Sequence, residues 1–170
     1  FRGQVATHAE FKPGGPKASQ LHSGTGPISM AQLTALRQSR RGVPLDLVVF
    51  SACRTALGDA DAELGFSGLA LQAGARSAVG TLWYVDDVVT SAYFVQMYRY
   101  LTQGVPKAEA MQLTRQAFIR GLIRLVDDQV VGADDTPLLT DLTPSQRRRV
   151  VDGVKNPFFW AGIELMGAPW

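Results

Sequence analysis

The stretch "LVVFSACRTALGD", residues 47–59, decides how the fold is interpreted. Four apolar residues, Leu47 to Phe50, run almost directly into Cys53, the only cysteine of the chain. A short continuous apolar run is typical of a strand buried on both faces of a parallel sheet. Small and turn-forming residues follow, so Cys53 comes just past the end of this strand. It is either a buried thiol that fills core space or a nucleophile presented at a strand end.

The composition narrows the classes of protein that need to be considered. The chain has 170 residues, 46% hydrophobic and 19% charged, which predicts one domain with a real core. A net charge of +2 argues against a nucleic-acid partner, and no apolar run approaches the roughly 20 residues of a membrane helix. A single cysteine forms no internal disulfide, and we expect a cytoplasmic protein. Because the chain starts at Phe1 without Met, we expect an upstream part of the same polypeptide to be a partner.

Strand-like and helix-like segments alternate along the chain. We expect strands at 2–7, 45–51 and 77–83, a last strand within 158–167, and helices at 29–40 (with Ser29 as N-cap), 66–74, 86–104 and 106–121. Residues 9–27 have the composition of a long loop, and residues 122–156 are less regular. The alternation predicts an α/β fold with a mainly parallel central sheet.

Chemically useful side chains follow three of the predicted strands. His8 comes just after the strand 2–7, Cys53 after 45–51, and Asp86 and Asp87 after 77–83. In parallel sheets, functional groups gather at the carboxyl ends of the strands. If these strands are parallel, all four residues meet at one edge, where a cysteine and a histidine distant in sequence form a recognised nucleophile–base pair.

Each of these side chains also has a simpler interpretation. His8 can be a satisfied strand-end histidine, and the two aspartates can be caps that favour the helix dipole. His22 lies in a Gly/Ser-rich segment and is more typical of a solvated loop. The acidic residues that begin at Asp59 are more typical of a solvated loop than of a metal site. "QRRR", residues 146–149, is either a solvated helix face or a contact for an acidic partner. We find no metal-ligand spacing and no phosphate-binding glycine motif.

Several blocks, taken together and in order, resemble the CHAT domain, a caspase-like peptidase module. They are "VATHAEF", "VVFSACRTALGD", "GFSGLALQAGARSAVGTLWYVDD", "TSAYFVQMYRYLTQGVPKAEAMQLTRQAF" and "NPFFWAGIELMGAPW", and they cover nearly the whole chain. The first and last blocks are most similar to the versions in cyanobacterial members. The resemblance implies a caspase-like three-layer sandwich over residues 1–170, with N-terminal strand or strands of the sheet supplied by upstream sequence.

The same resemblance implies a cysteine endopeptidase that cleaves a protein substrate. Carried over position by position, Cys53 is the nucleophile and His8 the catalytic histidine. The backbone N–H groups of Cys53 and Ala9 form the oxyanion hole. The family motif commonly has glycine after the histidine; alanine keeps the N–H but resists positive φ. No third carboxylate, metal or cofactor is implied.

We also expect cleavage after a basic residue, arginine before lysine. Asp86 or Asp87 is the candidate specificity carboxylate, because "GTLWYVDD" is similar to the corresponding segment of separase; Asp59 is the reserve candidate. A carboxylate can pair bidentately with guanidinium. The alternative function is a catalytically silent caspase-like scaffold that binds other proteins. The presence of both His8 and Cys53 favours the peptidase.

Overall fold

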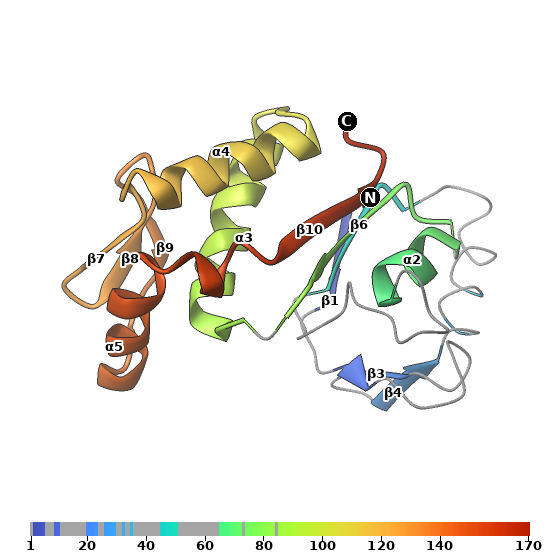
Figure 1. The fold of residues 1–170 in the computed structure, drawn as a ribbon, viewed down its shortest axis with the longest axis horizontal. Coiled ribbons are helices and arrows are strands. Elements are labelled where there is room, and N and C mark those ends of the chain that lie inside the picture. The colour runs from blue at the N-terminus through green and yellow to red at the C-terminus, as the bar shows by residue number, and fades with distance from the viewer. Residues whose placement is uncertain are drawn as a thin grey trace. The chain divides into compact units, whose positions relative to one another are not determined.

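The computed structural model describes residues 2–5, 9–10, 20–23, 26–29, 32, 35, 45–50, 65–72, 74–83 and 85–170 (Figure 1). The chain forms two compact units. The first contains residues Phe1–Tyr84 and Ile163–Ala168, and the second contains Val85–Gly162 and Pro169–Trp170. The expected single domain over residues 1–170 stays a prediction.

The first unit is built on a four-stranded sheet. Its strand order is β1-β5-β6-β10, with β1 at Arg2–Val5, β5 at Leu47–Phe50, β6 at Ser77–Thr81 and β10 at Ile163–Gly167 (Figure 1). Strand β5 pairs in parallel with both β1 and β6, whereas β10 pairs antiparallel with β6. The predicted α/β class is therefore confirmed. The three-layer arrangement and the extra N-terminal strands stay predictions.

Strand β5 is as buried as its sequence predicts. Leu47, Val48, Val49 and Phe50 are each no more than 5% exposed, and all five residues of β6 are buried. Helix α2, at Gly65–Gln72, packs against both strands. Successive side chains of a strand point to opposite faces and all four are buried, so neither face of β5 meets solvent, which is why it needs an unbroken apolar run.

The N-terminal segment contains strands where a loop was expected. Residues 9–27 include β2 at Ala9–Glu10, β3 at Gln20–Ser23 and the start of β4 at Gly26–Ser29, which form an antiparallel sheet in the order β2-β3-β4. For these residues the loop prediction was wrong, because pairing across the sheet overrides the weak β-propensity of Gly, Pro and Ser; the rest of 9–27 lies outside the described residues. Within the predicted helix 29–40, Ser29 ends β4 and Gln32 and Ala35 are helical; the other residues lie outside the described part.

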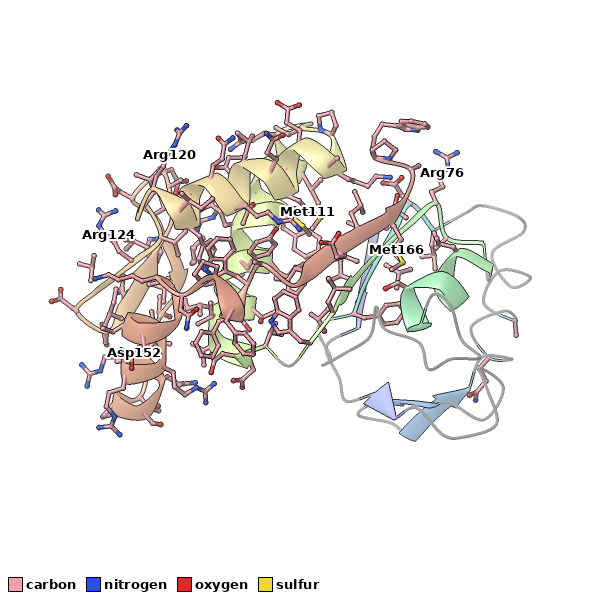
Figure 2. All side chains as sticks on the ribbon, in the orientation of Figure 1. Arg76, Met111, Arg120, Arg124, Asp152 and Met166 are labelled. Carbon is pink, nitrogen blue, oxygen red and sulfur yellow. The ribbon has the colours of Figure 1, made fainter. Side chains whose placement is uncertain are left out.

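The second unit is organised around two helices that the sequence predicted. They are α3 at Asp87–Thr102 and α4 at Lys107–Ile119, and they pack against each other. Their shared core is aromatic: the centroid of the Phe118 ring lies 5.7 Å from that of the Tyr93 ring and 5.4 Å from that of the Trp160 ring. The Tyr93 hydroxyl donates to the Met111 carbonyl at 3.3 Å, and Figure 2 shows Met111 on α4. No helix within the described ranges is long and apolar enough to cross a membrane.

Residues 122–156 are more regular than their sequence suggested. They contain strands β7 at Arg124–Val126, β8 at Gln129–Val131 and β9 at Pro137–Leu139, paired antiparallel in that order, and then α5 at Pro144–Gly153. A capping box starts α5: Gln146 N–H donates to Thr143 Oγ1, and the Gln146 side chain accepts from Thr143 N–H. The predicted last strand is shorter than 158–167, because Pro157–Phe159 forms the 3₁₀ helix η2.

The β8–β9 connection is tied to α3 by polar contacts. Gln96 Oε1 accepts from the Ala133 N–H at 3.0 Å, and Arg99 Nη1 donates to Asp134 Oδ1 at 3.0 Å. Arg99 also donates to the Thr136 hydroxyl. A hydrogen bond from the Thr136 side chain, assisted by the Arg99 charge, holds the pKa of Asp134 below its usual value.

This contact predicts a small, pH-dependent contribution to stability. We expect Asp134→Asn to lower the free energy of unfolding at pH 7 by at most about 0.5 kcal/mol, since the side chain is 51% exposed and screened by solvent. Because folding lowers the Asp134 pKa, its contribution is present above the unfolded pKa and disappears as the pH falls through the folded pKa. Urea unfolding of wild type and variant at pH 7 and at about pH 3 measures this. Asp152→Asn, at an exposed position on α5 (Figure 2), is the control. A difference that grows toward low pH contradicts the assignment.

Candidate active site

The strands that precede His8 and Cys53 are adjacent, parallel and in register. Val5, the last residue of β1, is the Cα partner of Phe50, the last residue of β5. His8 follows Val5 by three residues, and Cys53 follows Phe50 by three residues. Because the two strands are parallel and their last residues are paired, β1 and β5 end at the same edge of the sheet. His8, Cys53 and Asp59 lie outside the described residues, and their roles stay predictions.

Two further residues named from the sequence lie in the antiparallel sheet of the first unit. Ala9 is the first residue of β2 and is paired with Leu21 of β3. The oxyanion role of its N–H stays a prediction. His22 lies within β3, opposite Pro27 of β4, and not in a loop as its Gly/Ser-rich surroundings suggested. The local composition again failed to reveal a strand that is formed by pairing.

Asp86 is the N-cap of α3. Its Oδ1 accepts from the backbone N–H groups of Val88 at 2.9 Å and Val89 at 3.1 Å. The side chain is only 14% exposed. Such a cap satisfies two otherwise unpaired donors and places negative charge at the positive end of the helix dipole. Capping uses one carboxylate oxygen and leaves Oδ2 for another partner.

Arg149 of α5 supplies that partner. Its Nε–H donates to Asp86 Oδ2 at 2.7 Å, and its Nη2–H donates to Asp87 Oδ1. One guanidinium therefore connects both aspartates. The hydrogen bond with Asp86 is the main cause of a raised Arg149 pKa. The sequence left open whether the arginine run 146–149 is solvated or contacts acidic groups. For Arg149 the acidic groups are in the same chain, 62 and 63 residues away.

A cavity lies beside Asp87. Its volume is about 240 Å³, and α3, the segment after β9 and the start of α5 line it. Its polar lining includes Asp87, Ser91, Thr140, Asp141 and Gln146. The Asp87 side chain is 85% exposed, so this carboxylate faces solvent. Carboxylates and hydroxyls around an open cavity suit a cationic, hydrogen-bond-donating group. Over the described ranges, no cluster of histidine, cysteine, aspartate and glutamate is arranged to hold a metal ion.

The first unit is thus an α/β unit in which two adjacent parallel strands, β1 and β5, end at paired positions, each three residues before a histidine or a cysteine in the sequence. A model of the CHAT domain matches residues 5–168, and the chain belongs to the CHAT domain family. The match extends through both compact units. No curated protein gave a match to the chain.

Proposed function

We propose that the protein is a cysteine endopeptidase with a Cys53–His8 dyad. The observation that carries this proposal is the register of β1 and β5. Their last residues, Val5 and Phe50, are paired, and His8 and Cys53 each follow three residues later in the sequence. Membership of the CHAT domain family, whose members are typically related to caspase-like peptidases, supports the same activity.

The chemistry follows from the two side chains. The Cys53 thiolate attacks the scissile carbonyl and forms a thioester acyl-enzyme. His8 protonates the leaving amine and then activates the water that hydrolyses the thioester. The backbone N–H groups of Cys53 and Ala9 stabilise the oxyanion, and loss of one such donor typically costs about 3 kcal/mol of barrier. No metal or cofactor takes part in these steps.

We propose cleavage after a basic residue, with Asp86 and Asp87 as the recognition pair. Two observations support this choice. The pair already holds a guanidinium, that of Arg149, and the exposed Asp87 carboxylate lines a cavity of about 240 Å³. A planar guanidinium can reach two acceptors at once, whereas lysine presents a point charge, so arginine should be preferred.

Fluorogenic peptides that vary only at the residue before the cut test this specificity. Asp86 is best changed to Asn, because asparagine also caps helices and Asp86→Ala would weaken α3. We expect wild type to favour arginine, and Asp86→Asn or Asp87→Asn to reduce kcat/KM for arginine peptides about 10-fold or more. Asp59→Asn tests the reserve candidate. A wild-type preference for acidic or apolar residues refutes the specificity. An arginine preference that survives all three substitutions refutes its proposed cause.

We propose that the substrate is a regulatory protein and that the enzyme is cytoplasmic. We also propose that the upstream part of the same polypeptide is a partner of this domain. The "ATHAEF" and "FFWAGIELMGAPW" versions of two blocks resemble the HetF-type proteins of cyanobacteria, which act in heterocyst differentiation. We therefore propose a developmental substrate of that kind, and neither a nucleic acid nor a membrane as partner. Incubation of candidate regulators with wild type and with Cys53→Ala, followed by mass spectrometry of the fragments, identifies the cut.

A further inference from the structure

We propose that Arg149 is an internal competitor for the Asp86–Asp87 pair, which must leave before a basic substrate residue can bind. This inference rests on the proposed function, since it concerns the recognition pair named there. It makes α5 a regulator of substrate binding. Three features of the structure support this inference: the hydrogen bonds of Arg149 to both aspartates, the solvent exposure of its side chain, and the contacts that hold α5 in place without it.

Competition follows from the position that the Arg149 guanidinium occupies between the two carboxylates. Asp86 Oδ1 is used by two backbone N–H groups, at 2.9 and 3.1 Å. Its Oδ2 is the remaining oxygen and accepts from Arg149 Nε at 2.7 Å, while Nη2 of the same guanidinium reaches Asp87. An incoming guanidinium that bridges the two aspartates as Arg149 does would occupy the same place between the two carboxylates, and two cations held there would repel each other. Arg149 and the substrate residue therefore exclude each other there.

Arg149 is also positioned to leave. Its side chain is 41% exposed, so the guanidinium can rehydrate without being drawn through the protein. The contact with Asp87, which is 85% exposed, contributes little because solvent and salt screen it, whereas Asp86 is only 14% exposed. The cavity beside Asp87 adds further polar groups near the pair, among them Asp141 and Gln146. Gln146 lies three residues before Arg149, one turn earlier on α5, so the displaced arginine stays close to this polar lining.

Helix α5 does not depend on this ion pair for its own position. The Thr143–Gln146 capping box fixes its start. Val150 and Val154 are buried, and Gly153 approaches Val89 of α3 so closely that an added Cβ would lie 2.4 Å from Val89 Cγ2. We therefore expect α5 to stay in place when the Arg149 side chain is removed, which makes substitution of Arg149 an informative test.

The kinetic test compares Arg149→Gln with the matched control Arg148→Gln, at the exposed neighbouring position, in the full-length protein. We expect Arg149→Gln to lower KM for peptides with arginine before the cut about 3- to 10-fold, with kcat unchanged. Peptides with leucine at that position should not respond, and Arg148→Gln should behave as wild type. An unchanged or raised KM for arginine peptides, with an unchanged thermal midpoint, refutes the competition.

A binding measurement separates this inference from the proposed function. Calorimetric titration with n-butylguanidinium needs no proteolysis, and we expect Arg149→Gln to bind it more tightly than wild type by the same factor. Equal affinity of the two proteins refutes the competition even if arginine peptides are cut. Tighter binding in the variant, with no cleavage by either protein, supports the competition and refutes the peptidase. If Arg149→Gln fails to fold, Arg149→Lys replaces it. A lysine cannot span both carboxylates as guanidinium does, so an intermediate gain is expected and no gain refutes the proposal.

Discussion

We expect Cys53→Ala to abolish cleavage of peptide and protein substrates, and His8→Ala to do the same. We expect each substitution to lower kcat/KM by at least about 10³-fold, because the nucleophile and its proton-transfer partner act as one unit. The thermal midpoints should stay close to that of wild type, since both residues follow strands whose core positions are unchanged. Initial rates with an arginine peptide, measured beside thermal unfolding, check both parts.

The matched control for the histidine is His22→Ala. The chain has only two histidines, so these two substitutions test every possible imidazole base within it. His22 lies in β3 opposite Pro27, away from the ends of β1 and β5 in sequence, and we expect its substitution to be nearly silent in kcat. If His22→Ala removes activity while His8→Ala does not, the assignment of the base is wrong.

Gly167→Ala should give the largest loss of stability. Gly167 has φ +92°, which side chains rarely adopt, and an added Cβ would lie 2.4 Å from the Arg76 carbonyl oxygen and 3.2 Å from Ser77 Cα. Both neighbours are backbone, and Gly167 is the register partner of Ser77, so relief requires the β6–β10 pairing to shift. Figure 2 shows the Arg76 side chain pointing outward; the atom that an added Cβ on Gly167 would meet is the Arg76 carbonyl oxygen. We expect a loss of about 2–4 kcal/mol in the free energy of unfolding.

Gly104→Ala isolates the conformational part of that cost. Gly104 has a similar φ of +85°, but an added Cβ there meets nothing within 4 Å. Its substitution should cost about 1 kcal/mol, the usual penalty for placing alanine at positive φ. Chemical denaturation of the two variants and wild type compares them. A Gly167→Ala variant that loses no more stability than Gly104→Ala contradicts the close approach of β10 to Arg76.

The sequence predicted those elements whose signal is local. β5 has an unbroken apolar run, and α3 has acidic residues at its start and Gly104 just past its end, so both were predicted within a few residues. The sheet β2-β3-β4 was missed, because strand pairing between distant positions supplies what composition does not. The capping box of α5 was present in the sequence as Thr143 and Gln146. The helix was not predicted, because its arginine-rich sequence contains too few apolar residues to show helical spacing.

The candidate site was predictable to a similar extent. Alternation of strands and helices indicates parallel strands, so a shared edge for the ends of β1 and β5 could be expected, and the structure shows that these two strands are parallel and adjacent. The capping role of Asp86 was one of the alternatives that the sequence left open, and the structure shows it. The Arg149 contact was not predictable, because it joins residues more than 60 positions apart and depends on how α5 packs on α3.

Covalent labelling of the chain by a peptidyl electrophile tests the central claim most directly. A peptide with a terminal arginine and an acyloxymethyl ketone is attacked only by an activated nucleophile, and the chain has a single cysteine. We predict that the intact mass increases by one inhibitor adduct, that peptide mapping places it on Cys53, and that His8→Ala slows labelling at least about 100-fold. Absence of an adduct in the folded full-length protein, or an adduct that persists in Cys53→Ala, contradicts the dyad and favours a scaffold that binds proteins without cutting them.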